Sequence, residues 1–339
     1  MTLRELSKAC GLSVSFLSQI ERGLSSFSIP SLRAICQALD VSLAEMLVIS
    51  NGPGKAFLAD PRPPTITKGD NRSYINLSDT SVKYRFLSGG FPGRAFEALI
   101  GELSPGSAHP PSSHEGEEFG YVLAGAARLQ VGEETHTLGK GDSYHLLAST
   151  PHGCSSEEDS GAKILWVQTA TYAKSLSLVP DDGGRERPRY SQVRASRGSG
   201  PEPASHISLD GSAIRYRFLS GEFPERRLEM ILAEIPSGCR ETPCSIEQEE
   251  FGYILEGRGR LTIGAETYRL GTGDCYHLPG TTPHVCETVD AEDVKLLLVR
   301  TVHPPIPLDV EAAGGANGRR VSRRGMTGDR SRIAQNRRR

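Results

Sequence analysis

The chain has 339 residues, which is enough for two or three domains that each bury a core. Charged residues make up 24% of it and hydrophobic residues 37%, as in an ordinary globular protein. We see neither a signal peptide nor an apolar run of membrane-spanning length, so we expect a cytoplasmic protein without a membrane partner. The net charge of −2 argues against a generally basic nucleic-acid-binding protein, and seven cysteines, an odd number, argue against a disulfide framework.

The first fifty residues predict a small helical unit. Thr2 and Glu5 have the spacing of a capping box at the start of a helix that ends at Gly11. We expect a second helix over Val14–Arg22 with Ser13 as its N-cap, a third from about Pro30, and a short fourth over 41–48. The residues expected to face inward are Leu3, Leu6, Cys10, Leu17, Ile20, Leu32, Ile35, Cys36 and Leu39.

Two short helices joined by a glycine turn are typical of a helix-turn-helix, although other small helical bundles share this pattern. The run from Leu3 to Gly23 resembles the XRE family of lambda-repressor-like proteins, with the signature at Ser13, Leu17, Ser18, Ile20, Glu21 and Gly23. The resemblance implies that Val14, Ser15 and Gln19 face base edges of double-stranded DNA. It also implies that Ser13, Ser18 and Arg22 hold phosphates.

The unit departs from that family in two ways. The family has a further helix before the capping box, so we expect either a start upstream or a unit that lacks one wall. Phe27 stands where the family usually has proline. The unit carries four basic and four acidic residues, so one copy alone should bind DNA weakly, and we expect a homodimer. The segment 310–339, rich in arginine near its end, predicts a disordered basic tail.

The middle of the chain repeats itself with a constant offset of 132 residues. The segment Glu117–Gly125 recurs as Glu249–Gly257, and Gly141–Leu146 recurs as Gly273–Leu278. Each copy has short alternating segments, such as Ala126–Val131, separated by turns rich in Gly, Asp and Pro, which is typical of an all-β barrel or sandwich. A constant offset indicates two copies of one domain.

Each copy resembles the cupin family. In the first copy the family's motif positions hold Gly106, Ser112, His114, Glu118, Gly125, Gly141, Asp142, Pro151 and His152. In the second they hold Gly238, Cys244, Ile246, Glu250, Gly257, Gly273, Asp274, Pro283 and His284. The fold expected is therefore multidomain, α plus all-β: a helix-turn-helix over 1–50, then cupin barrels over 57–177 and 188–303.

The resemblance bears on a metal site, because a full cupin site has three imidazoles and one carboxylate. The first copy keeps His114, Glu118 and His152, which suits a divalent metal such as iron, manganese, zinc or nickel. The alternative is a polar pocket, including Ser112, that binds an organic ligand directly. His109 lies outside the site by register.

The second copy keeps Glu250 and His284 only, so we expect no metal there. Glu250, His284 and Cys244 are candidates for a ligand pocket, although Cys244 is most simply a buried cysteine. Two further pairs, Tyr144 with His145 and Tyr276 with His277, are candidates for the pocket lining. Strand alternation turns one member of each pair inward without identifying which one.

The sequence thus predicts a DNA-binding transcriptional regulator, not an enzyme, whose cupin domains sense a small-molecule effector. The alternative is a cupin metalloenzyme, a dioxygenase or isomerase, with a vestigial helix-turn-helix. Missing ligands in both copies count against the enzyme. A third reading makes the barrels a dimerisation scaffold without a ligand.

Overall fold

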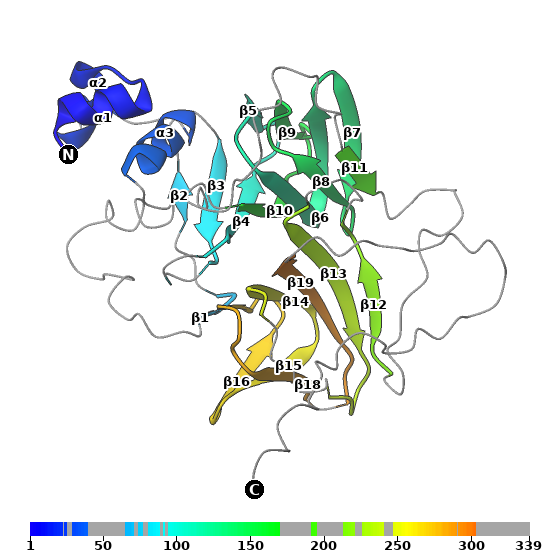
Figure 1. The fold of residues 1–339 in the computed structure, drawn as a ribbon. Helices are drawn as coiled ribbons and strands as arrows, with labels where there is room; N and C mark the ends of the chain where they lie inside the picture. The colour runs from blue at the N-terminus through cyan, green and yellow to red at the C-terminus, as the bar shows by residue number, and fades with distance from the viewer. Residues whose placement is uncertain are drawn as a thin grey trace, which may run out of the picture.

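The computed structural model describes residues 1–22, 24–25, 29–39, 65–70, 74–76, 81–88, 91, 94–169, 191–194, 213–220, 226–240, 247–289 and 291–302. Within the described residues, three helices precede two barrels, which lie one above the other in Figure 1. The expected multidomain α plus all-β fold is confirmed. The expected fourth helix, the basic tail, Cys244 and Ile246 lie outside the described residues. None of the described helices is long and apolar enough to cross a membrane.

Capping residues set where the first two helices begin and end. Helix α1 covers Leu3–Cys10, and its capping box is present: Thr2 Oγ1 accepts from the Glu5 N–H, and Glu5 Oε2 accepts from the Thr2 N–H at 2.7 Å. Gly11 ends α1 in the left-handed conformation, with φ of 74°, which glycine adopts without steric cost. Helix α2 covers Val14–Glu21 with Ser13 as its N-cap. The predicted second helix is therefore one residue too long.

Helix α3 covers Ile29–Leu39 and joins the helical unit to a barrel. Leu32 and Cys36 belong to the same buried cluster as Val82, Tyr84 and Trp166, which are residues of the first barrel. Leu17 of α2 and Ile35 of α3 are also buried but lie outside that cluster. In Figure 1, α3 lies between the strand pair β2–β3 and the other two helices. The helical unit thus rests on the first barrel through α3.

The first barrel contains a large sheet with the strand order β11-β8-β6-β10-β4-β3-β2 and a smaller group in which β5, β7 and β9 pair with one another or with β6. Its strands are β2 (Ile75–Asn76), β3 (Val82–Phe86), β4 (Phe96–Leu103), β5 (Ala108–Ser112), β6 (Glu117–Val131), β7 (Glu134–Gly139), β8 (Ser143–Leu147), β9 (His152–Ser156), β10 (Ala162–Thr169) and β11 (Ser191–Arg194).

The second barrel repeats this plan with the sheet β1-β17-β14-β19-β13-β12 and the smaller sheet β16-β15-β18. Its strands are β1 (Thr65–Thr67), β12 (Arg215–Phe218), β13 (Leu228–Ile235), β14 (Glu250–Glu256), β15 (Arg258–Ile263), β16 (Glu266–Gly271), β17 (Cys275–Leu278), β18 (His284–Thr288) and β19 (Val294–Thr301).

The barrels exchange strands. Strand β1, which precedes the first barrel in the sequence, pairs with β17 of the second, and Thr65 lies opposite His277. Strand β11, which precedes the second barrel, pairs with β8 of the first, and Gln192 lies opposite His145. Each of the predicted segments, 57–177 and 188–303, therefore contributes one strand to the barrel formed by the other.

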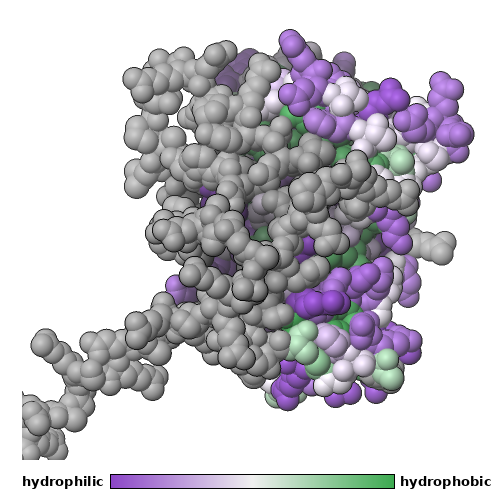
Figure 2. All heavy atoms as spheres, turned by 90° about the vertical axis from the view of Figure 1, so that its right-hand side faces the viewer, coloured by the Kyte–Doolittle hydropathy of each residue, from purple (hydrophilic) through white to green (hydrophobic). Residues whose placement is uncertain are grey.

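A shared hydrophobic core joins the two large sheets. It includes Phe96, Ile100 and Phe119 from the first barrel and Met230, Phe251 and Val299 from the second. Both faces of the central strands are therefore buried, one inside its own barrel and the other between the barrels. On the side drawn in Figure 2, hydrophilic side chains predominate on the described outer surface.

Candidate functional site

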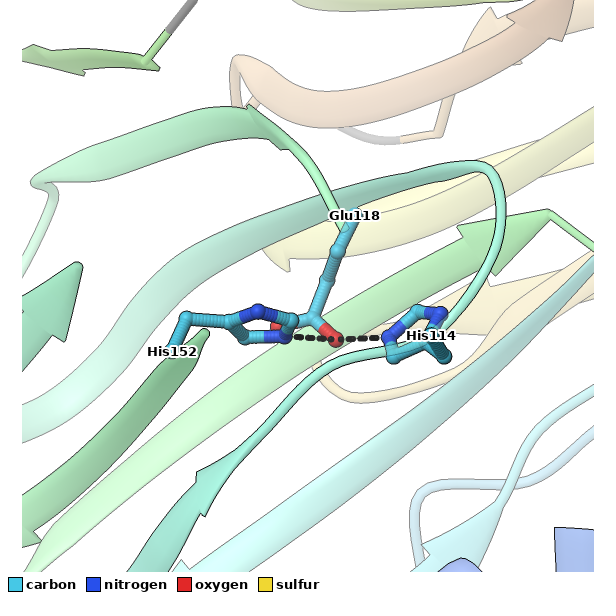
Figure 3. A group of neighbouring side chains, drawn as sticks. All are labelled: His114, Glu118 and His152. Carbon is cyan, nitrogen blue, oxygen red and sulfur yellow. Dashed lines mark hydrogen bonds and ion pairs between the residues drawn. The ribbon is translucent and has the colours of Figure 1, made fainter. Parts of the chain in front are cut away.

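Two imidazoles converge on one carboxylate inside the first barrel (Figure 3). Glu118 stands at the start of β6, His152 begins β9, and His114 lies in the turn between β5 and β6. Glu118 Oε2 is 3.2 Å from Nε2 of His114 and 3.3 Å from Nε2 of His152. One ligand atom from each residue lies within 4.8 Å of the other two. The structure thus brings together the three predicted metal ligands.

The outer nitrogen of each imidazole fixes its orientation. Nδ1 of His114 lies 3.0 Å from the carbonyl oxygen of Glu115, and Nδ1 of His152 lies 2.7 Å from that of Thr150. Because a carbonyl oxygen only accepts, each Nδ1 carries a proton, and a neutral ring then turns its Nε2 lone pair toward Glu118. Two lone pairs and a carboxylate oxygen repel one another unless a proton or a cation lies between them. The donor set therefore fits a divalent metal ion.

Tyr144 holds the other oxygen of the same carboxylate. Its hydroxyl donates to Glu118 Oε1 at 2.8 Å and accepts from the indole N–H of Trp166 at 2.8 Å. The ring of Tyr144 lies directly over Gly120, where a Cβ atom would come within 2.0 Å of Cε1. Only glycine fits there, so the Gly in the repeated Glu-Glu-Phe-Gly-Tyr segment is a packing requirement of this tyrosine.

The electrostatics of this group favour a charged carboxylate. Burial by itself raises the pKa of Glu118, but the charge and the Nε2–H hydrogen bonds of protonated His152 and His114 lower it more, so the pKa lies well below its ordinary value. Burial and the Glu118 charge raise the pKa of Tyr144 well above its ordinary value, so the phenol keeps its proton. Glu118 is thus an anion, and a divalent cation would take the place of the protons that lie between it and the two imidazoles.

Ser112 lies beside this group, and His109 lies apart from it. In the ladder between β5 and β9, Ser112 is directly opposite His152. Ser112 is also the motif position at which the resemblance to cupins implies a further imidazole. The ring of His109 contacts Tyr84 and Trp166 at centroid distances of 6.4 and 6.0 Å.

The second barrel has a related cluster with a different counter-ion. Glu250 Oε1 accepts from the Tyr276 hydroxyl at 2.8 Å and lies 2.9 Å from Nε2 of His284. Glu250 Oε2 accepts from Nε of Arg300 at 2.6 Å. Arg300, which the sequence motifs passed over, occupies the place of Gln168 in the first barrel. The sequence repeat could have identified Arg300, because it lies 132 positions after Gln168, which is the offset of every other repeated pair.

The structure brings neither His145 nor His277 to these clusters. His145 is buried between the barrels, stacked on Phe119 at a centroid distance of 3.6 Å, with Nε2 3.2 Å from Glu117. His277 lies 2.9 Å from Glu249 in the same way. Of the two candidate pairs, Tyr144 and Tyr276 are the members that face inward, so their neighbours His145 and His277 face the other barrel.

Helix α2 presents most of its predicted DNA-contact residues to solvent. Ser13, Val14, Ser15, Gln19 and Arg22 are exposed, and Ser18 is half-buried. Two of them are partly engaged, because Ser13 caps α2 and the Arg22 Nε donates to the Ser18 carbonyl oxygen at 3.1 Å. Val14, Ser15 and Gln19 thus lie on the accessible side of α2.

Family models match three parts of the chain. The helix-turn-helix model matches residues 1–46, and the cupin domain model matches residues 99–168 and again residues 231–300. The chain belongs to the helix-turn-helix proteins with cupin domains. The two cupin matches fall on the two barrels, and the third falls on the helical unit and the residues after it.

Two relatives are similar to parts of this helix-turn-helix cupin protein. Over 172 residues, 50% of this chain, it is 24% identical to the HTH-type transcriptional regulator PuuR of Escherichia coli strain K12, of which 88% is covered. Over 93 residues, 27% of this chain, it is 31% identical to protein MJ1618 of Methanocaldococcus jannaschii, of which 74% is covered.

Solved structures resemble the two-barrel part. A putative glyoxylate-induced protein from Pseudomonas aeruginosa gives a TM-score of 0.60 at 12% identity, covering 77% of this chain and 96% of that one. The protein Ylba from E. coli gives 0.56 at 13% identity, covering 77% and 98%. At these identities the likeness is one of fold alone.

Proposed function

We propose that this protein is a DNA-binding transcriptional regulator whose first cupin barrel senses a small-molecule or metal effector. The observation that carries the proposal is the packing of α3, through Leu32 and Cys36, into the buried cluster of the first barrel. The same cluster contains Tyr144 and Trp166, which are hydrogen-bonded to each other and, through Tyr144, to Glu118. A continuous set of contacts thus runs from the candidate site to the helical unit.

The proposed effect of a ligand follows from these contacts. A cation bound by Glu118, His114 and His152 would fix the carboxylate and with it Tyr144, whose ring packs in the core that α3 completes. A shift of α3 would reorient α2, and two reading helices on DNA must match a spacing of about one helical turn. Because one chain has a single α2, we infer that a homodimer binds a palindromic operator.

A selection experiment tests this function. The full-length protein would be incubated with random-sequence DNA duplexes, and the bound fraction would be sequenced with Mn²⁺ present and again after chelation. We expect an enriched palindrome whose recovery depends on the metal. Recovery of unselected sequences in both conditions would overturn the proposal.

The cluster at Glu118 also supports a second candidate, a cupin metalloenzyme of the dioxygenase or isomerase type. Two histidines and one carboxylate leave open metal positions, the arrangement found in non-haem iron oxygenases. The two candidates differ in a measurable way. Oxygen consumption or substrate turnover that requires bound iron or manganese supports the enzyme, whereas metal-dependent DNA binding without turnover supports the regulator.

A further inference from the structure

The clusters of the two barrels share a central carboxylate, a tyrosine and a histidine. They differ at His114, whose counterpart in the sequence is Ile246, and at Gln168, whose counterpart is Arg300. Gln168 of β10 lies opposite both Glu118 and Glu97 in the strand ladders of the first barrel. Arg300 of β19 lies opposite both Glu250 and Glu229 in the second. Residues directly opposite each other in a ladder share a face of the sheet, with Cβ atoms about 5 Å apart. The side chain at this position therefore decides what reaches the central carboxylate.

An arginine–glutamate pair beside the central carboxylate recurs in both barrels. Arg94 pairs with Glu97 at 2.8 Å in the first, and Arg226 pairs with Glu229 at 3.0 Å in the second. The tyrosine hydroxyl and the histidine that face the central carboxylate also recur, as Tyr144 and His152, then Tyr276 and His284. The exchange of glutamine for arginine is thus a difference of one positive charge.

In the second barrel the guanidinium of Arg300 binds one oxygen of Glu250. The corresponding oxygen of Glu118 faces the two imidazoles in the first barrel. Glu118 Oε2 is directed at the two imidazole nitrogens, at 3.2 and 3.3 Å. Glu250 Oε2 is instead taken by the Arg300 Nε at 2.6 Å, in an ion pair whose carboxylate side chain is only 2% exposed. A charge-assisted hydrogen bond of this length leaves little room for a metal ion, and the guanidinium repels one.

We propose that the residue at this ladder position selects the cation that each barrel holds: Arg300 is a built-in substitute for the metal in the second barrel, and Gln168 admits a divalent ion to the first. The selection in the first barrel rests on the metal binding proposed above. The expected stoichiometry is one divalent ion per chain.

Exchanging the side chain tests the selection. Full-length wild type, Gln168→Arg and Gln168→Met would be stripped with a chelator and titrated with Mn²⁺ by calorimetry. Wild type and Gln168→Met should bind one equivalent, because neither side chain is charged. Gln168→Arg should bind Mn²⁺ about 10- to 100-fold more weakly, because the guanidinium forms a hydrogen bond with Glu118 Oε2. Undiminished binding by Gln168→Arg, or an equal loss in Gln168→Met, would overturn the selection.

A second measurement separates this inference from the proposed metal site. In the metal-free proteins, Arg300→Gln should lower the melting temperature, whereas Gln168→Arg should raise it, and the rise should vanish in a Glu118→Gln background. A wild-type protein that binds no Mn²⁺ would refute the proposed metal site. The melting temperatures would still decide whether arginine at this position takes the place of a metal ion beside the carboxylate. An unchanged melting temperature of Arg300→Gln would overturn that role.

Discussion

Glu117 of the first barrel accepts a 2.6 Å hydrogen bond from the backbone N–H of Arg227 in the second. Its other oxygen accepts from the N–H of Leu228 at 3.1 Å. The relationship is reciprocal, since Glu249 of the second barrel accepts from the N–H of Ala95 in the first at 2.7 Å. Each of the two buried carboxylates therefore binds backbone N–H groups at the start of a strand in the opposite barrel.

The Glu117→Gln variant should loosen this contact between the barrels. The amide keeps one acceptor oxygen but loses the charge that three donors share, including His145, which is fully buried. We expect a loss of about 1–3 kcal/mol in the free energy of unfolding, measured by urea denaturation. The matched control is Glu157→Gln in the exposed pair with Arg128, which should change stability by less than about 1 kcal/mol. Equal effects of the two changes would contradict the interface role.

Gly120→Ala should displace Tyr144 from the candidate site. The added methyl group would collide with the ring, so the tyrosine must leave its hydrogen bonds to Glu118 and Trp166. We expect destabilisation of about 1–3 kcal/mol and a change in tryptophan fluorescence, because Trp166 is the single tryptophan of the chain. Gly139→Ala is the control, since its nearest neighbour would be an ordinary contact at 3.8 Å. A normal emission spectrum of Gly120→Ala would refute the predicted displacement.

Gln19→Ala tests base reading by α2. An exposed glutamine can bind adenine with two hydrogen bonds, a contact worth roughly 1–3 kcal/mol of discrimination. The variant should bind the selected operator about 5- to 150-fold more weakly while its binding to unrelated DNA stays nearly the same. Fluorescence anisotropy with both duplexes measures the ratio. An equal loss on both duplexes would assign Gln19 to the phosphate backbone instead.

Leu32→Ala tests the coupling between α3 and the first barrel. Truncating this buried side chain, which is 1% exposed, should cost about 2–5 kcal/mol and abolish the effect of Mn²⁺ on DNA affinity. Leu17→Ala is the matched control, because Leu17 is buried within the helical unit and lies outside the barrel cluster. It should weaken DNA binding equally with and without Mn²⁺. Retained metal dependence in Leu32→Ala would exclude this route.

The ion pair of Arg300 with Glu250 predicts a pH dependence of stability. Burial raises the pKa of Glu250, but Arg300 and then His284 lower it more, to about 2 from an ordinary 4.5. A folded-state pKa below the unfolded one gives stability that is present above about pH 4.5 and is lost as the pH falls toward about 2. Urea unfolding should show a contribution from Glu250 that falls by on the order of 1 kcal/mol between about pH 6 and about pH 4.

Arg300→Gln provides the control for that dependence. Without the guanidinium the pKa of Glu250 rises, so the variant is less stable at neutral pH and loses less on acidification. The difference between the two proteins isolates this ion pair from the other carboxylates. Parallel stability curves for wild type and variant across this range would show that Arg300 does not set the charge of Glu250.

Local chemistry explains why so much of the fold was predictable. The capping box of Thr2 with Glu5 and the left-handed Gly11 depend on neighbours in sequence, so their patterns predicted both ends of α1. The constant repeat predicted two similar barrels, and the resemblance to cupins implied that His114, Glu118 and His152 converge. These features can be predicted from residues that are close in sequence, from the repeat, or from motif positions.

The remaining features depend on distant partners. Alternation could not identify whether Tyr144 or His145 faces inward, because the second barrel buries the outer face as fully as the core buries the inner one. The pairing of β1 with β17 joins residues more than 200 positions apart, and a period of two carries no information about a strand's partner. Arg300 was not predicted as a site residue because it lies outside the motif segments.

The strand exchange also indicates how such a chain can arise. In each barrel an edge of the large sheet is completed by a strand that precedes the other barrel in the sequence: β1 completes the second and β11 the first. Two separate single-barrel chains that traded their leading strands would make the same pairings between molecules. Duplication and fusion of such a gene would turn a swapped dimer into one polypeptide without breaking a single ladder, and would free the two halves to diverge, as Gln168 and Arg300 have.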